Sequence, residues 1–342
     1  MSGKTALVTG ASGFIGSNLC KRLASEGWNV RGLIRKTSSR EFLDGLDVTL
    51  CEGTVGDPGS LAAAADGADM VFHLAARPPD WGSLEVFRKD NVEGTRNVLE
   101  ACVAKGVRRV FHMSSLSVHP FSGHVDTGED APFVTPEYVG RAATFGYCQA
   151  KAEAETLAFD FARERGLELS AARTGMAYGP NDHGIFYQLA EGIRKGLYSH
   201  VGGGNTYMPW CYVENLLDGI VLASTLPGAI GRVYNVVDDG KVTMRDFVEK
   251  TCDALGWKRP RFSVPLAFAR FTGAALEDLY LLFGAKKGPP ITRYRIAYVA
   301  KHLHFSNERV KRELGWEPRV SLEEGLERTA AWYLRYTGKA AA

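Results

Sequence analysis

The stretch LVTGASGFIG, residues 7–16, carries three glycines at intervals of three. An apolar, strand-like run precedes them, and a helix-like segment follows from Phe14 to Gly27. Between a strand and a helix, such glycines allow a tight turn, a close backbone approach to a pyrophosphate, and close packing of the helix on the strand. A glycine-rich turn without a ligand is the alternative. We expect a dinucleotide-binding turn made of Gly10, Ser12, Gly13, Phe14, Ile15 and Gly16.

Strand-like and helix-like segments alternate through the first half of the chain. This alternation is typical of βαβ units, whose right-handed crossovers build a parallel sheet covered on both faces by helices. We therefore expect an α/β fold with a Rossmann-type doubly wound parallel sheet. The further strands are expected at 29–34, 48–51, 69–74, 109–113 and 167–172, and the further helices at 58–65, 86–105 and 147–165.

The pattern changes after Arg173, where glycine and proline cluster and helix-like segments dominate. We expect residues 1–174 to form the dinucleotide-binding domain. Residues 175–342 are expected to form mostly a smaller, mostly helical C-terminal substrate cap. Segments near 205–240, with a strand at 233–237, are expected to return to the Rossmann domain.

Composition excludes several classes of protein. The chain has 342 residues, of which 45% are hydrophobic and 23% charged, which argues against intrinsic disorder. Its 41 basic and 39 acidic side chains leave a net charge of +2, so no nucleic-acid partner is expected. Six cysteines without a Cys-x-x-Cys pair suit a reducing compartment, and no histidine pair has metal-ligand context, so we expect no metal. Without a signal-peptide pattern or a long uncharged apolar run, a cytoplasmic protein with no integral membrane segment is expected.

A second motif, YCQAK at residues 147–151, begins the long helix expected at 147–165. Its spacing places Tyr147 and Lys151 on one helix face. A phenol can exchange a proton with a carbonyl or alcohol oxygen while a hydride moves, and a nearby ammonium lowers the phenol pKa from its usual value of about 10. Lys151 can also bond the nicotinamide ribose. The serines at 114, 115 and 117 follow the fifth strand, where parallel sheets bind ligands, and one of them is expected to hold the substrate oxygen.

We expect the residues at the end of the second strand to determine whether the chain binds NAD or NADP. An acidic side chain there would bond the ribose 2′-hydroxyl of NAD, whereas an arginine would accept the 2′-phosphate of NADP. The chain has Arg35 and Lys36 at this place, followed by Ser38 and Ser39. The sequence therefore favours NADP(H), with NAD(H) left open and a solvated basic loop as the alternative.

Taken together, these residues resemble the extended short-chain dehydrogenase/reductase family. The resemblance includes HLAA at 73–76, NVEGT at 91–95, RTGMAYGP at 173–180 and VEN at 213–215. It implies that Ser115, Tyr147 and Lys151 are catalytic, and that Tyr147, Lys151, Ala75 and Arg35 also contact the cofactor. The chain differs from common family motifs at Thr54, Thr174 and Glu214.

The C-terminal motifs resemble the branch of 3β-hydroxysteroid dehydrogenases and sterol-4-carboxylate 3-dehydrogenases. They are PPITR at 289–293, FSNERV at 305–310 and LGWEP at 314–318. The branch implies an NAD(P)-dependent oxidoreductase that interconverts a secondary alcohol and a ketone on an apolar substrate, sterol-like or a long-chain 3-oxo or 3-hydroxy acid. A nucleotide-sugar epimerase or dehydratase, which the Arg35–Lys36 pair disfavours, and a non-catalytic dinucleotide-binding sensor are the alternatives. A homodimer is left open.

The stretch from Pro265 to Phe283 is apolar, with few charges. The simplest interpretation is core of the cap. The alternatives are an apolar lid over the substrate, with Phe268 or Phe271 facing the pocket, and a helix that makes peripheral contact with a membrane surface. The cations that follow, Lys286, Lys287, Arg293 and Arg295, are either a solvated face or a site for a substrate carboxylate.

Overall fold

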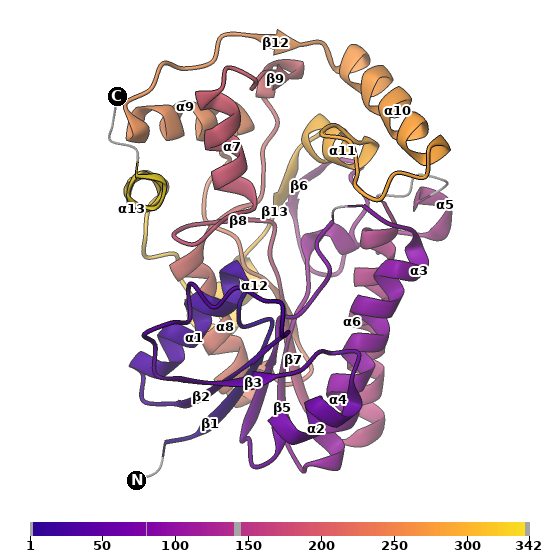
Figure 1. Cartoon of the computed structure of the whole chain (residues 1–342), viewed down its shortest axis with the longest axis vertical. Helices are drawn as coiled ribbons and strands as arrows, with labels where there is room; N and C mark the ends of the chain where they lie inside the picture. The colour runs from indigo at the N-terminus through magenta and orange to yellow at the C-terminus, as the bar shows by residue number, and fades with distance from the viewer. Residues whose placement is uncertain (1–2, 80, 140–144, 339–342) are drawn as a thin grey trace.

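A seven-stranded sheet, parallel throughout, lies at the centre of the structure (Figure 1). The structure is a computed structural model, and it describes residues 3–79, 81–139 and 145–338. The sheet order is β11-β7-β5-β4-β1-β2-β3, in which the strand order reverses beside β1, so the expected doubly wound sheet is confirmed. The strands are β1 (Thr5–Thr9), β2 (Asn29–Ile34), β3 (Val48–Glu52), β4 (Met70–His73), β5 (Arg109–Met113), β7 (Glu168–Arg173) and β11 (Val233–Asn235).

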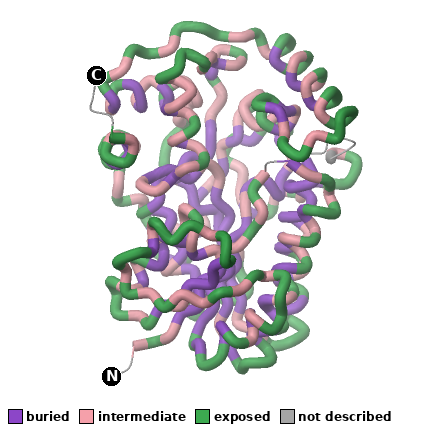
Figure 2. The backbone as a smooth tube through the Cα atoms, viewed as in Figure 1, coloured by how far each residue is buried: buried purple, intermediate pink, exposed green. Residues whose placement is uncertain are grey.

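Helices cover both faces of the sheet (Figure 1). On one face, Leu7, Val71 and Val110 pack against α2 (Pro58–Ala65), α4 (Gly94–Ala104) and α6 (Gly146–Arg165). On the other face, Val8 and Phe72 pack against α1 (Phe14–Ser25) and α8 (Val213–Thr225). The strands are short continuous apolar runs because both of their faces are covered. Figure 2 shows the buried residues gathered in the sheet and along the inner sides of these helices.

The segment near 205–240 contributes to the sheet, since α8 packs on it and β11 pairs with β7. A later helix, α12 (Glu308–Leu314), also contacts α8 and β11.

Most of the remaining elements lie at the end of the sheet where the strands terminate (Figure 1). This places the cap over the carboxyl edge of the sheet, where βαβ proteins bind ligands. Its helices are α7 (Ile185–Arg194), α9 (Met244–Leu255), α10 (Leu266–Leu282), α11 (Arg293–Ala300) and α13 (Leu322–Thr337). The short strands at this end of the sheet are β6 (His124–Thr127), β8 (Met176–Tyr178), β9 (His200–Val201), β10 (Trp210–Tyr212), β12 (Ser263–Val264) and β13 (Leu303–Phe305).

The single helix expected at 86–105 is divided in the structure. A short helix α3 (Leu84–Phe87) leads into a π-helical stretch, Arg88–Glu93, before α4 begins. The Asn91 side chain in this stretch accepts a 2.6 Å hydrogen bond from the main-chain N–H of Arg77. The π-helical stretch therefore holds the loop after β4, which sequence periodicity does not reveal. Across the described ranges, no helix has both the length and the apolar content needed to cross a membrane.

Candidate active site

The glycine turn between β1 and α1 is closely packed. Gly10 has a φ of 71°, and a Cβ there would lie 2.9 Å from the main-chain nitrogen of Ala75. A Cβ on Gly16 would lie 2.1 Å from the Gly10 oxygen, while the Gly13 N–H donates to that same oxygen at 3.0 Å. Among the residues that the structure describes, no side chain caps the N-terminus of α1. Its first N–H groups are thus available to an anion, and the turn fits a dinucleotide diphosphate.

The end of β4 is tied to this turn through Thr9. The Ala75 N–H donates to the Thr9 hydroxyl at 3.2 Å, and the Thr9 hydroxyl also lies 2.9 Å from Nδ1 of His73. The other ring nitrogen of His73 lies 3.0 Å from the Thr95 hydroxyl on α4. Burial, together with the Lys151 charge, lowers the His73 pKa to about 3, so the ring is neutral and joins β1, β4 and α4. Ala75 therefore lies directly beside Gly10.

Arg35 and Lys36 follow β2 and are exposed. The Arg35 N–H donates to the Ser38 hydroxyl at 3.2 Å, which shapes the loop. Within the described residues neither cation has an ion-pair partner, so both remain available to an anionic group. At the end of β3, the Thr54 hydroxyl accepts a hydrogen bond of 2.9 Å from Gly56.

Ser115, Tyr147 and Lys151 are brought together where β5 ends beside α6. Tyr147 and Lys151 are buried on one helix face, and the Ser115 hydroxyl lies close enough to the Tyr147 phenol to lower its pKa. Nζ of Lys151 donates to the main-chain oxygen of Met113 at 2.7 Å. Ser115 also accepts a 3.1 Å hydrogen bond from the Ser117 N–H, which begins a short 3₁₀ turn. The Ser115 and Tyr147 hydroxyls thus lie together at the carboxyl edge of the sheet, and Lys151 follows Tyr147 one turn later on α6.

Burial dominates the pKa values in this group. It raises the Tyr147 pKa to about 12, opposed by the Ser115 hydrogen bond, so the phenol is protonated at neutral pH. Burial lowers the Lys151 pKa to about 8, opposed by the carboxylate of Glu155. The lowering of the Tyr147 pKa that the sequence led us to expect is outweighed, because the phenol is enclosed by aromatic rings, including Phe87 at 6.1 Å and Tyr294 at 6.3 Å.

A buried ion pair lies behind Lys151, and sequence reasoning did not find it. Glu155 and Arg173 are both 3% exposed, and Arg173 donates two hydrogen bonds to the Glu155 carboxylate. The Ser114 hydroxyl donates to the same carboxylate at 2.5 Å, and Arg173 also donates to the main-chain oxygen of Glu129 at 2.7 Å. The four-residue spacing from Lys151 to Glu155 is the signal that could have placed Glu155 on this face.

The cap reaches the candidate site through Tyr294 on α11. The rings of Tyr294 and Tyr147 are perpendicular, and the Tyr294 hydroxyl lies 3.2 Å from that of Ser117. Phe121 and Phe145 pack edge-on against Tyr294 at 5.4 and 5.8 Å. The site therefore has an aromatic wall contributed partly by the cap.

The stretch from Pro265 to Phe283 is not cap core along its whole length. Its helix, α10, packs on α11, but Phe268 and Phe271 are 59% and 72% exposed. The interpretation of the whole stretch as cap core is therefore wrong at these two positions. Apolar content alone does not reveal which side of a helix a neighbouring element will cover.

Three comparisons relate the chain to known proteins. A family model, the NAD dependent epimerase/dehydratase family, matches residues 6–236. The 2-alkyl-3-oxoalkanoate reductase of Stenotrophomonas maltophilia (strain K279a) is 33% identical over 340 residues, which cover 95% of this chain and 98% of that protein. The sterol-4-alpha-carboxylate 3-dehydrogenase (decarboxylating) of Mus musculus is 26% identical over 335 residues, covering 95% and 90%. The crystal structure of gox2253 superposes with a TM-score of 0.81 at 28% identity, covering 98% of this chain and 99% of that one.

The seven-stranded sheet, the glycine turn and the Tyr147–Lys151 pair have the arrangement of a nicotinamide-dinucleotide enzyme. With the family match, the chain belongs to the NAD-dependent epimerase/dehydratase family, the extended short-chain dehydrogenases/reductases. It is an enzyme of the oxidoreductase class, and the sequence resemblance to this family and to its 3β-hydroxysteroid dehydrogenase-like relatives is confirmed.

Proposed function

We propose that this enzyme interconverts a secondary alcohol and a ketone on an apolar substrate, with Ser115, Tyr147 and Lys151 as its catalytic residues. The observation that supports this most directly is the buried Tyr147 phenol, which lies beside the Ser115 hydroxyl and packs against aromatic side chains. A protonated phenol beside a second hydroxyl suits a substrate oxygen that gains or loses a proton.

The bound nicotinamide cofactor supplies or accepts the hydride at the substrate carbon. In the direction of reduction, the Tyr147 phenol gives its proton to the ketone oxygen, and the Ser115 hydroxyl donates a hydrogen bond to the same oxygen. The reverse reaction returns the proton to Tyr147. Below about pH 8 Lys151 is an ammonium, and its positive charge stabilises the phenolate that proton transfer leaves behind. Glu155 helps Lys151 to remain charged, because its carboxylate opposes the effect of burial.

For the cofactor, we assign the diphosphate to the turn of Gly10, Ser12, Gly13, Phe14, Ile15 and Gly16, where the free N–H groups of α1 begin. Ala75 lies against Gly10 and would line the same site. Lys151 and Tyr147 would contact the nicotinamide end. Arg35 and Lys36, both exposed without an ion-pair partner among the described residues, would hold a 2′-phosphate, so NADP(H) is proposed over NAD(H).

The substrate class follows from the aromatic wall and from the relatives. Tyr147, Phe87 and Tyr294 surround the reacting group with apolar surface. The two relatives reported above are named for a 2-alkyl-3-oxoalkanoate and a sterol-4-alpha-carboxylate. Both names describe a carbon skeleton that carries a carboxylate and an oxygen at position 3. We therefore propose a long-chain 3-oxo or 3-hydroxy acid, or a sterol-like analogue, for this enzyme.

A substrate screen tests the proposal. The purified chain is assayed with NADPH and with NADH against 2-alkyl-3-oxoalkanoates of increasing chain length, 3-oxosterols and UDP-glucose. Each buried methylene contributes about 0.8 kcal/mol, so kcat/KM should rise roughly fourfold per methylene before it levels off. A flat series combined with epimerisation of UDP-glucose would instead identify a nucleotide-sugar epimerase and overturn the proposal.

A further inference from the structure

The helix α10 presents its large apolar side chains to the outside of the molecule. Its buried residues are small or charged: Ala269, Gly273 and Glu277, spaced by four. Its exposed residues include Phe271 and Leu282, with exposed fractions of 72% and 79%. A surface helix of a globular protein normally has the opposite arrangement, with its apolar stripe toward the core.

The inward face of α10 is already occupied. A Cβ on Gly273 would lie 2.3 Å from Cδ1 of Ile296, so α10 and α11 approach closely. The Glu277 carboxylate accepts a 2.8 Å hydrogen bond from the Arg293 N–H at the start of α11. These contacts fix which side of α10 faces inward and leave the phenylalanine side turned away from the protein.

The exposed apolar surface extends past both ends of the helix. Figure 1 places α10 and the segment that carries β12 along the outer edge of the cap, and Figure 2 shows the outward side of α10 as exposed. We call this surface the apolar face of α10, and its residues are Phe262, Phe268, Phe271, Leu279, Leu282 and Phe283. Exposed apolar side chains gathered on one element in this way mark an interaction site.

Positive charges are frequent in the stretch of chain that carries the apolar face. Between residues 256 and 292 the only acidic residues are Glu277, which is buried, and Asp278, which pairs with Arg293 at 2.6 Å. Arg259 pairs with Asp253, at 2.7 Å. In the described part of the chain the other cations of this stretch have no ion-pair partner; they are Lys258, Arg261, Arg270, Lys286 and Lys287.

We propose that the apolar face of α10 docks the cap on the surface of an anionic lipid bilayer. Phenylalanine and leucine side chains would enter the boundary between headgroups and acyl chains, and the unpaired cations of the same stretch would contact anionic headgroups. A second copy of this chain fits the surface less well, because symmetric pairing would bring unpaired cations of the same sign together. The proposed membrane interface is formed by α10. Helix α11 packs on α10 and, through Tyr294, contacts Tyr147, so α11 lies between the interface and the proposed proton donor.

Vesicle binding by the full chain tests the proposal. Wild-type protein should co-sediment with vesicles of phosphatidylcholine and phosphatidylglycerol, less with phosphatidylcholine alone, and less again in high salt. Phe268→Ser/Phe271→Ser should reduce the partition coefficient roughly tenfold or more. The control, Val103→Ser/Val125→Ser, also removes two exposed apolar side chains but outside this face, and should bind as wild type does. Circular dichroism checks that each variant is folded.

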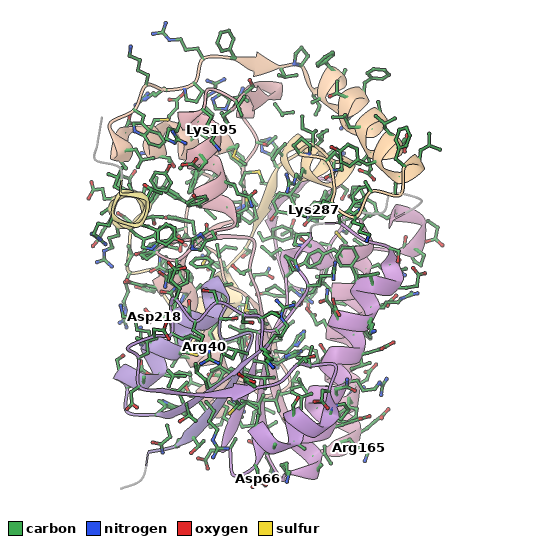
Figure 3. The ribbon with its side chains drawn as sticks, viewed as in Figure 1. Arg40, Asp66, Arg165, Lys195, Asp218 and Lys287 are labelled. Atoms are coloured by element: carbon green, nitrogen blue, oxygen red, sulfur yellow. The ribbon has the colours of Figure 1, made fainter. Side chains whose placement is uncertain are left out.

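Two charge-reversal variants test whether the apolar face of α10 binds anionic lipid rather than another partner. Figure 3 shows Lys287 in the upper part of the molecule and Arg165 near its lower end. Lys287→Glu should weaken binding to the anionic vesicles, whereas Arg165→Glu should not. The proposal is overturned if wild-type protein does not bind anionic vesicles, or if the double phenylalanine variant binds as tightly as wild type. Self-association that Phe268→Ser/Phe271→Ser abolishes, without vesicle binding, would show that the face joins two copies and would also overturn it.

Discussion

Nζ of Lys151 donates a 2.7 Å hydrogen bond to the main-chain oxygen of Met113, the last residue of β5. This contact joins the first turns of α6 to the point where the chain leaves the sheet toward Ser115. One turn earlier on the same helix, the Tyr147 phenol lies near the Ser115 hydroxyl, which lowers the pKa of the phenol. The Lys151 contact thus holds the start of α6 against the edge of the sheet, beside Ser115.

Glu155→Gln should destabilise the protein by about 3–5 kcal/mol, because it leaves the buried Arg173 guanidinium without its carboxylate. Denaturant unfolding measures the change. Asp160→Asn, on the same helix, breaks an exposed pair with Arg163 and should cost less than about 1 kcal/mol. Since Glu155 raises the Lys151 pKa, the alkaline limb of the pH–rate profile should also move to lower pH in Glu155→Gln. Equal, small losses in both variants would contradict this account of the pair.

Tyr147→Phe should reduce turnover by roughly 10²–10⁴, because it removes the proposed proton donor while keeping the ring. Cofactor affinity, measured by fluorescence titration, should change little. Tyr207→Phe is the control. Tyr207 lies in the cap, where its ring packs on that of His302 with 4.3 Å between the centroids. Removing the Tyr207 hydroxyl should leave turnover near the wild-type value. Turnover close to wild type in Tyr147→Phe would remove Tyr147 from the mechanism.

Gly16→Ala should prevent cofactor binding and lower stability, because its Cβ would lie 2.1 Å from the Gly10 oxygen. Gly192→Ala makes the same change within α7, where a Cβ meets no atom within 4 Å. That variant should be more stable by roughly 0.5–1 kcal/mol, since alanine favours the helix. Thermal unfolding with and without cofactor distinguishes the two. If Gly16→Ala bound cofactor normally, the turn would not be the diphosphate site.

Arg35→Asp should weaken NADP(H) binding far more than NAD(H) binding, because the new carboxylate repels the 2′-phosphate. Titration of both cofactors measures the ratio of their dissociation constants. Arg165→Asp reverses an exposed charge at the last residue of α6, near the lower end of the molecule in Figure 3, and should leave that ratio unchanged. If the wild-type protein binds NAD(H) more tightly than NADP(H), the prediction is wrong and Arg35 is only part of a solvated loop.

The buried His73 should make the protein less stable in acid. Its folded-state pKa is about 3, below the unfolded value of about 6.5. Between these values the unfolded chain binds a proton that the folded chain does not, so the free energy of unfolding falls as pH falls, by about 1.4 kcal/mol per pH unit. His73→Gln keeps a polar side chain but cannot titrate. Its unfolding free energy, measured between pH 6.5 and about 4, should fall less steeply than that of wild type; parallel curves would refute this contribution.

Much of the fold could be predicted because its determinants are local. The strand at 109–113 and the helix at 58–65 were expected at the bounds that β5 and α2 have. A short apolar run buried on both faces and a proline at a helix start are local features that need no knowledge of distant residues. The π-helical stretch Arg88–Glu93 was missed because its hydrogen-bond pattern depends on how the loop after β4 packs against it.

The candidate site divides in the same way. The glycine turn was visible because its tightest contact joins Gly10 and Gly16, six residues apart. Tyr147 and Lys151 were visible because one helix turn brings them together. The sequence marked Arg173 as part of the motif at 173–180 but did not predict its ion pair, because its partner Glu155 lies on a different element. Tyr294 was missed because it lies far along the chain and reaches Tyr147 only when α11 packs over the sheet edge.

The sequence by itself determined the parallel sheet, the dinucleotide turn and the Tyr147–Lys151 spacing, because backbone propensity and hydrophobic period act over a few residues. Only the tertiary structure decided which groups surround these residues. Burial raises the Tyr147 pKa, and the packing of α10 on α11 turns Phe268 and Phe271 outward. Desolvation and the choice of buried face depend on what lies on the other side of a side chain, and that neighbour is supplied by segments distant in the chain.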